Sequence, residues 1–236
     1  MRDFYNYYLN YLDVIRDDLD NGKTIFKSKQ RDVPINNYYF HYLIITNIEN
    51  KEVFSISPSF YDEFIHLKHM NLEEIKKFFD KKLKDYSSRV MYRMTIEENI
   101  FKFVEIDNKV QRLTEEILMK NLKGRNKNEI EDIWKRKEKE ILEGREFVIL
   151  KDDKIVSYCK ISNIDYNGGN LTVWTNPKYR GYGYGKQVTI AATKWCFDNN
   201  IIPIYLVYNE NLASLNLAKS IGFKILSKEF IISKEA

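Results

Sequence analysis

The feature that most constrains this 236-residue sequence is a cluster of glycines near its C-terminal end. The chain contains nine glycines, which is sparse against an average usage of about 7%, yet Gly181, Gly183 and Gly185 fall within five residues. A β-branched segment ends at Thr175 before the cluster, and apolar residues at helical spacing follow from Val188. The pattern predicts a strand, a glycine turn and the N-terminus of a helix.

A turn of this kind predicts a binding site for phosphate groups. Without Cβ atoms, successive backbone amides can point toward one ligand, and the unpaired N–H groups at the start of the helix add a positive end. Arg180 and Lys186 flank the glycines and can add charge. We therefore expect a local pyrophosphate site.

Two common phosphate loops do not fit the spacing. A Walker loop requires glycine and Ser/Thr where this chain has Arg180 and Gln187. A dinucleotide fingerprint requires a third glycine where Lys186 stands, although Glu210 beyond the next strand mimics its ribose-binding acid. Residues 186–236 are also too few to complete a doubly wound sheet.

The spacing Arg180-x-x-Gly183-x-Gly185 resembles the acyl-CoA pyrophosphate loop of the GNAT superfamily of N-acetyltransferases. Residues 211–223, which begin with Asn and end with Gly-Phe, resemble the second signature of that superfamily. The resemblance covers roughly residues 90–236.

Within the superfamily, one segment is most similar to the zwittermicin A resistance branch. It contains Pro203 and Ser214, and it has Ala218 where an aromatic residue is usual. The similarity is strongest from Val173 to Phe223, and it suggests an antibiotic or metabolite as the acceptor.

The resemblance implies an α+β GNAT fold with a mixed, mostly antiparallel central sheet flanked by helices. We expect a GNAT domain at residues 88–236 and an N-terminal α/β extension at residues 1–87. The implied activity is acetyl-CoA-dependent N-acetylation of a primary amine of a small molecule, by direct attack in a ternary complex. No covalent nucleophile is required, so positioning and carbonyl polarisation carry most of the rate.

The resemblance also implies roles for individual residues. Main-chain groups at the end of the strand before the loop are expected to bind pantetheine, and that of Thr175 to polarise the thioester carbonyl. Asn211 and Ser214 are expected to face the pantetheine arm and the sulfur. The full set of expected cofactor-binding residues is Trp174, Thr175, Asn176, Arg180, Gly181, Tyr182, Gly183, Tyr184, Gly185, Lys186, Asn211 and Ser214.

The two proton-transfer roles depart from the family pattern. Ala218 replaces the usual acid tyrosine, and Tyr208 at the end of its strand is the candidate substitute. The general base is unassigned: Glu97, Glu98 and Asp165 are candidates, and solvent is another. Because both usual groups are missing, a non-catalytic acyl-CoA-binding or regulatory module is the alternative function.

Composition limits the partners. Lys plus Arg exceed Asp plus Glu by 38 to 34, a formal charge of +4, which is too small to favour nucleic acid or a membrane as the main partner. Cys159 and Cys196 have no neighbours at metal-ligand spacing, so we expect no metal site and reduced, buried thiols. The polar start of the sequence predicts a cytoplasmic protein. A homodimer is one candidate assembly.

Periodicity also predicts individual elements. Apolar residues from Phe4 to Leu19 predict one amphipathic helix, and residues 110–122 predict another. Residues 38–48 and 52–56 predict strands. Asn71 and Glu74 have the spacing of a capping box.

Overall fold

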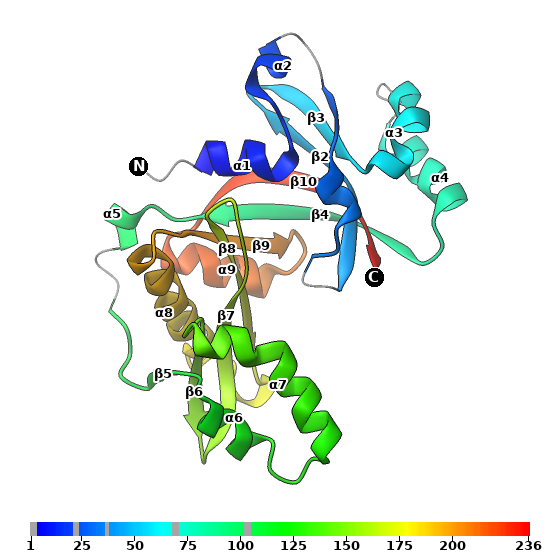
Figure 1. Cartoon of the computed structure of the whole chain (residues 1–236). Coiled ribbons are helices and arrows are strands. Elements are labelled where there is room, and N and C mark those ends of the chain that lie inside the picture. The colour runs from blue at the N-terminus through cyan, green and yellow to red at the C-terminus, as the bar shows by residue number, and fades with distance from the viewer. Residues whose placement is uncertain (1–3, 21–23, 36–37, 68–70, 102–104) are drawn as a thin grey trace. The chain divides into compact units, whose positions relative to one another are not determined.

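The computed structural model describes residues 4–20, 24–35, 38–67, 71–101 and 105–236. The chain forms two compact units (Figure 1). The first comprises Met1–Arg93, Val207–Asn211 and Ile225–Ala236, and the second comprises Met94–Leu206 and Leu212–Lys224. The predicted boundary near residue 87 treats each domain as one continuous segment, whereas both units are discontinuous.

The first unit is built on a sheet whose strands follow the order β1-β3-β2-β10-β4. Strand β1 runs parallel to β3, and β2 runs antiparallel to both β3 and β10. The expected strands at 38–48 and 52–56 are confirmed as β2 and β3. The bounds are β1 Ile25–Lys27, β2 Tyr39–Ile48, β3 Lys51–Ile56, β4 Tyr86–Thr95 and β10 Lys224–Glu235.

Helices cover both faces of this sheet (Figure 1). They are α1 (Phe4–Leu12), α2 (Arg16–Asp20), α3 (Pro58–Phe64) and α4 (Leu72–Lys82), with 3-10 turns η1 (Lys29–Asp32) and η2 (Ile65–Leu67). The capping box of α4 is confirmed, since Asn71 Oδ1 accepts from the amides of Glu73 and Glu74 and Glu74 accepts from the Asn71 amide.

The single helix expected from Phe4 to Leu19 is wrong. Helix α1 ends at Leu12 because Asp13 takes a left-handed φ of 59°, a conformation that Asp tolerates better than most residues. The amide of Val14 then donates to Leu9 O at 2.9 Å and closes the helix.

The two faces of the first sheet differ in chemistry. The face beneath α3 and α4 is apolar and includes Leu43, Phe54, Phe64 and Phe79. The opposite face carries a buried polar network under α1, in which Arg93 pairs with Glu229 and contacts tyrosines of α1. This network joins α1, β4 and β10.

The second unit is built on the strand order β9-β8-β7-β6-β5. Strands β5 to β8 are antiparallel to their neighbours, and β8 is parallel to β9. The bounds are β5 Val110–Arg112, β6 Glu146–Lys151, β7 Lys154–Asp165, β8 Gly168–Thr175 and β9 Ile202–Tyr208.

Helices cover the two faces of this second sheet. Helix α8 packs on one face, where Cys159 and Cys196 are free and buried as expected. Helices α6 and α7 pack on the other face against Val148 and Tyr158. The elements are α5 Glu98–Phe101, α6 Glu115–Asn121, α7 Lys127–Leu142, η3 Pro177–Tyr179, α8 Tyr184–Asp198 and α9 Leu212–Ile221.

The helix expected over residues 110–122 is confirmed only in its second half, where α6 spans Glu115–Asn121. Val110–Arg112 forms β5 and pairs with β6, so strand pairing overrides the local helical spacing. Helix α6 begins after Thr114, whose side chain accepts from the Ile117 amide at 3.2 Å. The expected α+β class, with a mostly antiparallel sheet flanked by helices, is confirmed.

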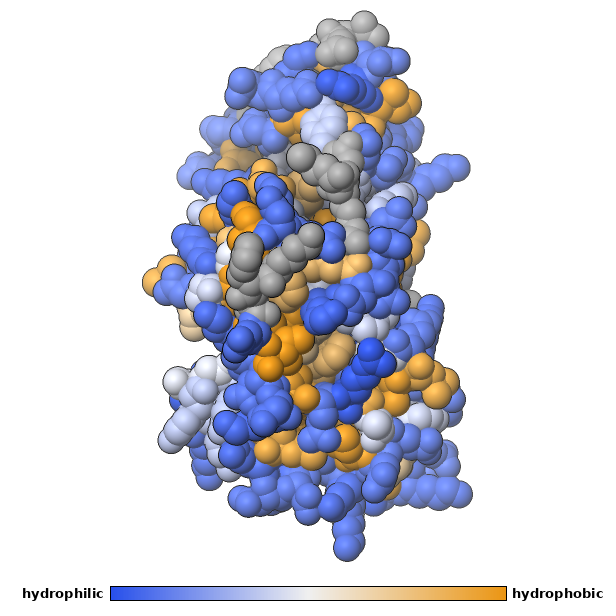
Figure 2. All heavy atoms as spheres, turned by 90° about the vertical axis from the view of Figure 1, so that its left-hand side faces the viewer, coloured by the Kyte–Doolittle hydropathy of each residue, from blue (hydrophilic) through white to orange (hydrophobic). Residues whose placement is uncertain are grey.

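Figure 2 shows one face, on which small groups of hydrophobic residues lie among hydrophilic ones. Within the described residues, no helix has both the length and the apolar character needed to cross a membrane.

Candidate active site

Strands β8 and β9 pair over a short distance and then separate. Their parallel register covers Gly168–Asn170 with Ile202–Ile204, although β8 continues to Thr175 and pairs with β7 to its end. In the described part of the chain, the last five residues of β8 therefore have no pairing with β9.

The direction of the backbone groups at this open edge follows from alternation along the strand. The Asn176 amide donates to Val156 O at 2.9 Å, on the β7 side. The N–H and C=O groups of a strand residue point to the same neighbour, and those of the next residue point away from it. Trp174 therefore faces β7, whereas Val173 and Thr175 present their backbone groups to the open edge.

The glycine loop follows directly after this edge. Gly181 and Gly183 have φ angles of 86° and 78°, and a Cβ added at either would meet no atom within 4 Å. Backbone conformation, and not lack of space, requires glycine at both positions.

Gly185 has a different reason to be glycine. A Cβ there would lie 2.9 Å from Thr175 Oγ1 and 3.0 Å from Leu217 Cδ1. The start of α8 therefore packs closely against β8 and α9. The same contact shows that the side chains of Thr175 and Val173 face α8.

The N-terminus of α8 supplies unpaired amides. Gly183 occupies the N-cap position and provides no side-chain cap. The first helical bond within the loop runs from the Gln187 amide to Gly183 O at 3.1 Å. The amides of Tyr184, Gly185 and Lys186 thus point out of the helix end, where the helix dipole favours an anion.

The charged residues of the loop are held differently. Arg180 is exposed, and its Nε lies 3.4 Å from Thr175 O, at the open edge. Lys186 Nζ instead donates to Ser220 O near the end of α9 at 3.0 Å. Lys151, which the sequence did not single out, places Nζ 5.8 Å from the ring centre of Tyr184.

Three tyrosines form a stack along the loop. The rings of Tyr182 and Tyr184 are 5.9 Å apart, and those of Tyr179 and Tyr184 are 6.5 Å apart. Tyr182 is 70% exposed. The stack therefore offers an aromatic surface to solvent beside the anion site.

Ser214 has a partner that the sequence analysis missed. Its Oγ lies 2.7 Å from the hydroxyl of Tyr205, a buried residue of β9 whose ring packs on Phe223. Burial raises the pKa of Tyr205 to about 12, partly offset by the hydrogen bond with Ser214. The phenol is therefore protonated at neutral pH and can donate a hydrogen bond to Ser214.

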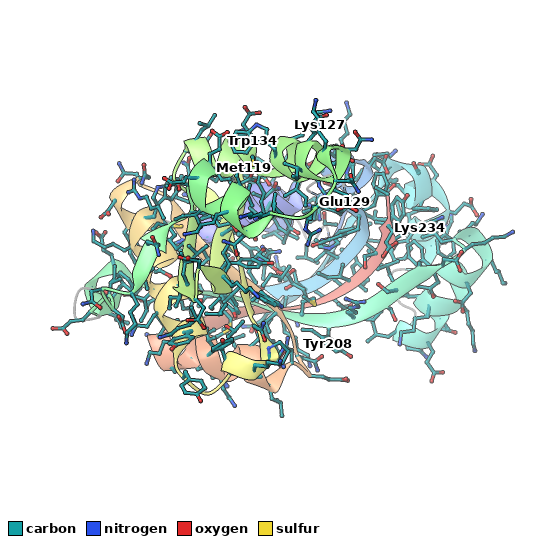
Figure 3. The ribbon with its side chains drawn as sticks, turned by 90° about the horizontal axis from the view of Figure 1, so that it is seen from below. Met119, Lys127, Glu129, Trp134, Tyr208 and Lys234 are labelled. Carbon is teal, nitrogen blue, oxygen red and sulfur yellow. The ribbon has the colours of Figure 1, made fainter. Side chains whose placement is uncertain are left out.

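Tyr208 and Asn211 belong to the first unit. A hydrogen bond to Glu210 raises the pKa of Tyr208, and the Asn211 amide donates to Tyr208 O at 2.9 Å in the turn before α9. Figure 3 labels Tyr208 at the end of its strand. Among the described residues, no group of three or more His, Cys, Asp or Glu side chains could hold a metal ion.

The open edge of β8 and the N-terminus of α8 thus lie next to each other in the chain, and both present unpaired backbone groups, with an anion favoured at the helix end. A family model described as GNAT acetyltransferase matches residues 46–231. The chain belongs to this family.

Two relatives from Bacillus subtilis match parts of the chain. One, named "Uncharacterized N-acetyltransferase YdfB", is 26% identical over 98 residues, covering 42% of this chain and 38% of the relative. The other, "Uncharacterized N-acetyltransferase YobR", is 31% identical over 83 residues, covering 35% and 34%. The matches thus span little more than a third of each relative's length.

Solved structures share the fold. An acetyltransferase from the GNAT family of Colwellia psychrerythraea has a TM-score of 0.51 at 13% identity, covering 83% of this chain and 84% of that one. A tandem GNAT protein from the clavulanic acid biosynthesis pathway also has a TM-score of 0.51, at 8% identity, covering 84% and 64%.

Proposed function

We propose that the protein binds acetyl-CoA and transfers its acetyl group to a primary amine of a small molecule. The observation that carries the proposal is the separation of β8 from β9 beside the open glycine loop. It leaves two adjacent sets of unpaired backbone amides, one suited to a diphosphate and the other to an extended, amide-containing chain.

The residues present fit acetyl-CoA. The unpaired amides of Tyr184, Gly185 and Lys186 at the start of α8 fit the diphosphate, and Arg180 in the glycine loop adds positive charge. Val173 and Thr175 present backbone groups that can pair with pantetheine as a strand would, and the Thr175 N–H can hold the thioester oxygen. When bound, acetyl-CoA supplies a thioester as the acyl donor. The Asn176 amide already donates to Val156 O, and the backbone groups of Trp174 also face β7. These two residues therefore contribute by holding Thr175 in place between them.

Two tyrosines are candidates to protonate the departing sulfur. Tyr205 can pass a proton through Ser214, which the family pattern places near the sulfur, and the two oxygens are 2.7 Å apart. Tyr208 is the candidate from the sequence. Both phenols are protonated at neutral pH, since the ordinary pKa of tyrosine is about 10 and both pKa values are raised from it. Either can therefore serve as an acid.

We assign no side chain as the base. An alkylammonium has a pKa of about 10.4, so the acceptor must lose a proton before it attacks. Trp174 next to the open edge is 39% exposed, which supports access of water to accept that proton. The antibiotic or metabolite class of the acceptor is supported by the resemblance to the resistance branch alone.

The test is release of free thiol from acetyl-CoA over a panel of primary amines. Each amine is paired with its N,N-dimethyl analogue, which forms no stable amide and so reports hydrolysis alone. We expect thiol release with at least one primary amine and not with its dimethyl partner. Binding of coenzyme A without any amine-dependent release would instead support the non-catalytic module.

A further inference from the structure

The side chains of β8 divide the open edge into two sides. Val173 and Thr175 face α8, as their proximity to Gly185 shows. Side chains alternate along a strand, so Thr172 and Trp174 point to the face that α6 and α7 cover. A second substrate can reach the thioester position from this face, because α8 closes the other one.

This face carries an aromatic shelf made of Tyr158 and Trp174. The two residues are register partners on β7 and β8, and their rings stack at 5.6 Å with an angle of 26° between the planes. One side of the Tyr158 ring is covered by α7, where Lys137 Nζ lies 5.4 Å from its centre. Trp174 remains 39% exposed, so it can stack with a further ring.

The charges around the shelf do not balance. Glu146 is buried and accepts from Lys137 Nζ with both carboxylate oxygens, each at 2.7 Å. Lys160 is the register partner of both Glu146 and Thr172, so all three side chains share this face. Among the described residues no acidic group lies within ion-pair distance of Lys160. Lys137, Glu146 and Lys160 thus contribute two ammonium groups and one carboxylate to this face.

An exposed indole next to an unpaired ammonium suits a particular class of acceptor. Lys160 is a diagonal neighbour of Trp174, a geometry that separates Cα atoms by about 7 to 8 Å and keeps long side chains within mutual reach. A purely cationic amine would be repelled by the excess positive charge. An amine that also carries a carboxylate would be attracted, because its carboxylate can pair with Lys160 while its ring stacks on Trp174.

We infer that the acceptor is an aromatic amino acid or a close analogue, with Lys160 pairing its carboxylate and Trp174 stacking on its ring. The inference rests on the proposed acetyl transfer, and it names the acceptor class for that site. Lys160 and Trp174 are specificity-determining residues in this account, and Glu146 and Lys137 hold Tyr158 and the shelf in place.

The test compares L-phenylalanine with 2-phenylethylamine, which differ by one carboxylate. We expect kcat/KM to be about tenfold higher for phenylalanine, the gain from one charge-assisted contact at a partly exposed site. Lys160→Met should bring the ratio close to one. Lys154→Met, at the exposed end of the same strand, is the matched control and should keep the wild-type ratio. Trp174→Leu should raise the KM for phenylalanine several-fold.

Calorimetry with the same two amines, with and without coenzyme A, gives a readout that needs no turnover. Tighter binding of phenylalanine that disappears in Lys160→Met supports the inference even if no acetylation is seen. If coenzyme A binds and both amines are acetylated equally, the proposed function stands and the acceptor class is overturned. Absence of phenylalanine binding in both conditions overturns it as well.

Discussion

Removing the charge of Glu229 should destabilise the first unit by several kcal/mol. Arg93 and Glu229 are buried, with exposed side-chain fractions of 1% and 0%. They make two parallel hydrogen bonds, Nε to Oε1 at 2.7 Å and Nη2 to Oε2 at 3.1 Å. Glu229→Gln keeps the shape of the side chain and leaves the guanidinium without a counter-charge. Breaking a buried pair in this way costs about 3 to 5 kcal/mol.

The cost depends on how much of the guanidinium is still stabilised. Arg93 Nη1 also donates to the hydroxyl of Tyr7 at 2.9 Å, and the guanidinium carbon Cζ of Arg93 lies 4.0 Å from the ring centre of Tyr11. The Tyr7 hydroxyl carries no negative charge at neutral pH, because burial raises its pKa, and the contact with Tyr11 is with the face of its ring. These contacts therefore cannot replace the carboxylate.

Urea denaturation measures the effect. With a slope of about 2 kcal/mol per molar urea, the midpoint of the transition should fall by about 1.5 to 2.5 M. Glu235→Gln, exposed at the end of the same strand, is the control and should shift it little. The double change Arg93→Met with Glu229→Leu should recover most of the loss, since a well-packed apolar pair can replace a buried ion pair. A shift of under about 0.3 M for Glu229→Gln would refute the reasoning.

Three further predictions concern His41, Gly185 and the two tyrosines. Burial, and then the nearby Arg31 and Arg93, lower the pKa of His41 to about 3. Below pH 6.5 the unfolded chain therefore binds a proton that the folded chain excludes. The free energy of unfolding should fall by about 1.4 kcal/mol per pH unit as the pH drops from about 6.5 toward 3. His41→Asn should flatten this slope in urea titrations, and an unchanged slope would count against it. Gly185→Ala should push α8 away from β8 and lower the free energy of unfolding by about 1 to 3 kcal/mol, which a lower melting temperature would report. An unchanged melting temperature and cofactor affinity would show that the contact of residue 185 with Thr175 is not tight. Tyr205→Phe should lower kcat with little change in the KM for acetyl-CoA. The wild-type rate should show no loss from Tyr205 ionisation below about pH 11, one unit under its pKa of about 12. If only Tyr208→Phe lowers kcat, Tyr208 is the acid.

The sequence predicted those features that depend on local chemistry. The glycine positions required a turn with free amides, and Gly181 and Gly183 have the positive φ angles that only glycine adopts easily. The Asn71 and Glu74 spacing predicted a capping box for the same reason, since all its bonds lie within four residues.

Features that depend on distant segments could not be predicted in this way. Val110 has helical spacing, but its strand pairing with Ile149 joins segments far apart in the chain. Tyr205 lies within an apolar strand, and its bond to Ser214 could not be predicted because it forms only when α9 packs on β9. Lys137 occupies a helical position otherwise suited to an apolar residue, a signal that could have indicated its buried partner Glu146.

The most direct test of the proposed diphosphate site in the glycine loop is calorimetric binding of coenzyme A to two matched variants, Gly183→Val and Gly124→Val. Both glycines have a positive φ, 78° and 94°, and neither has an atom within 4 Å of an added Cβ, so the backbone strain is similar. Gly124 lies in the turn before α7, away from the loop in sequence. We predict that Gly183→Val loses at least tenfold in affinity, a free-energy change of about 1.4 kcal/mol, while Gly124→Val binds as the wild type does. Equal affinity in the two variants, or no binding to the wild type at millimolar coenzyme A, would contradict the account.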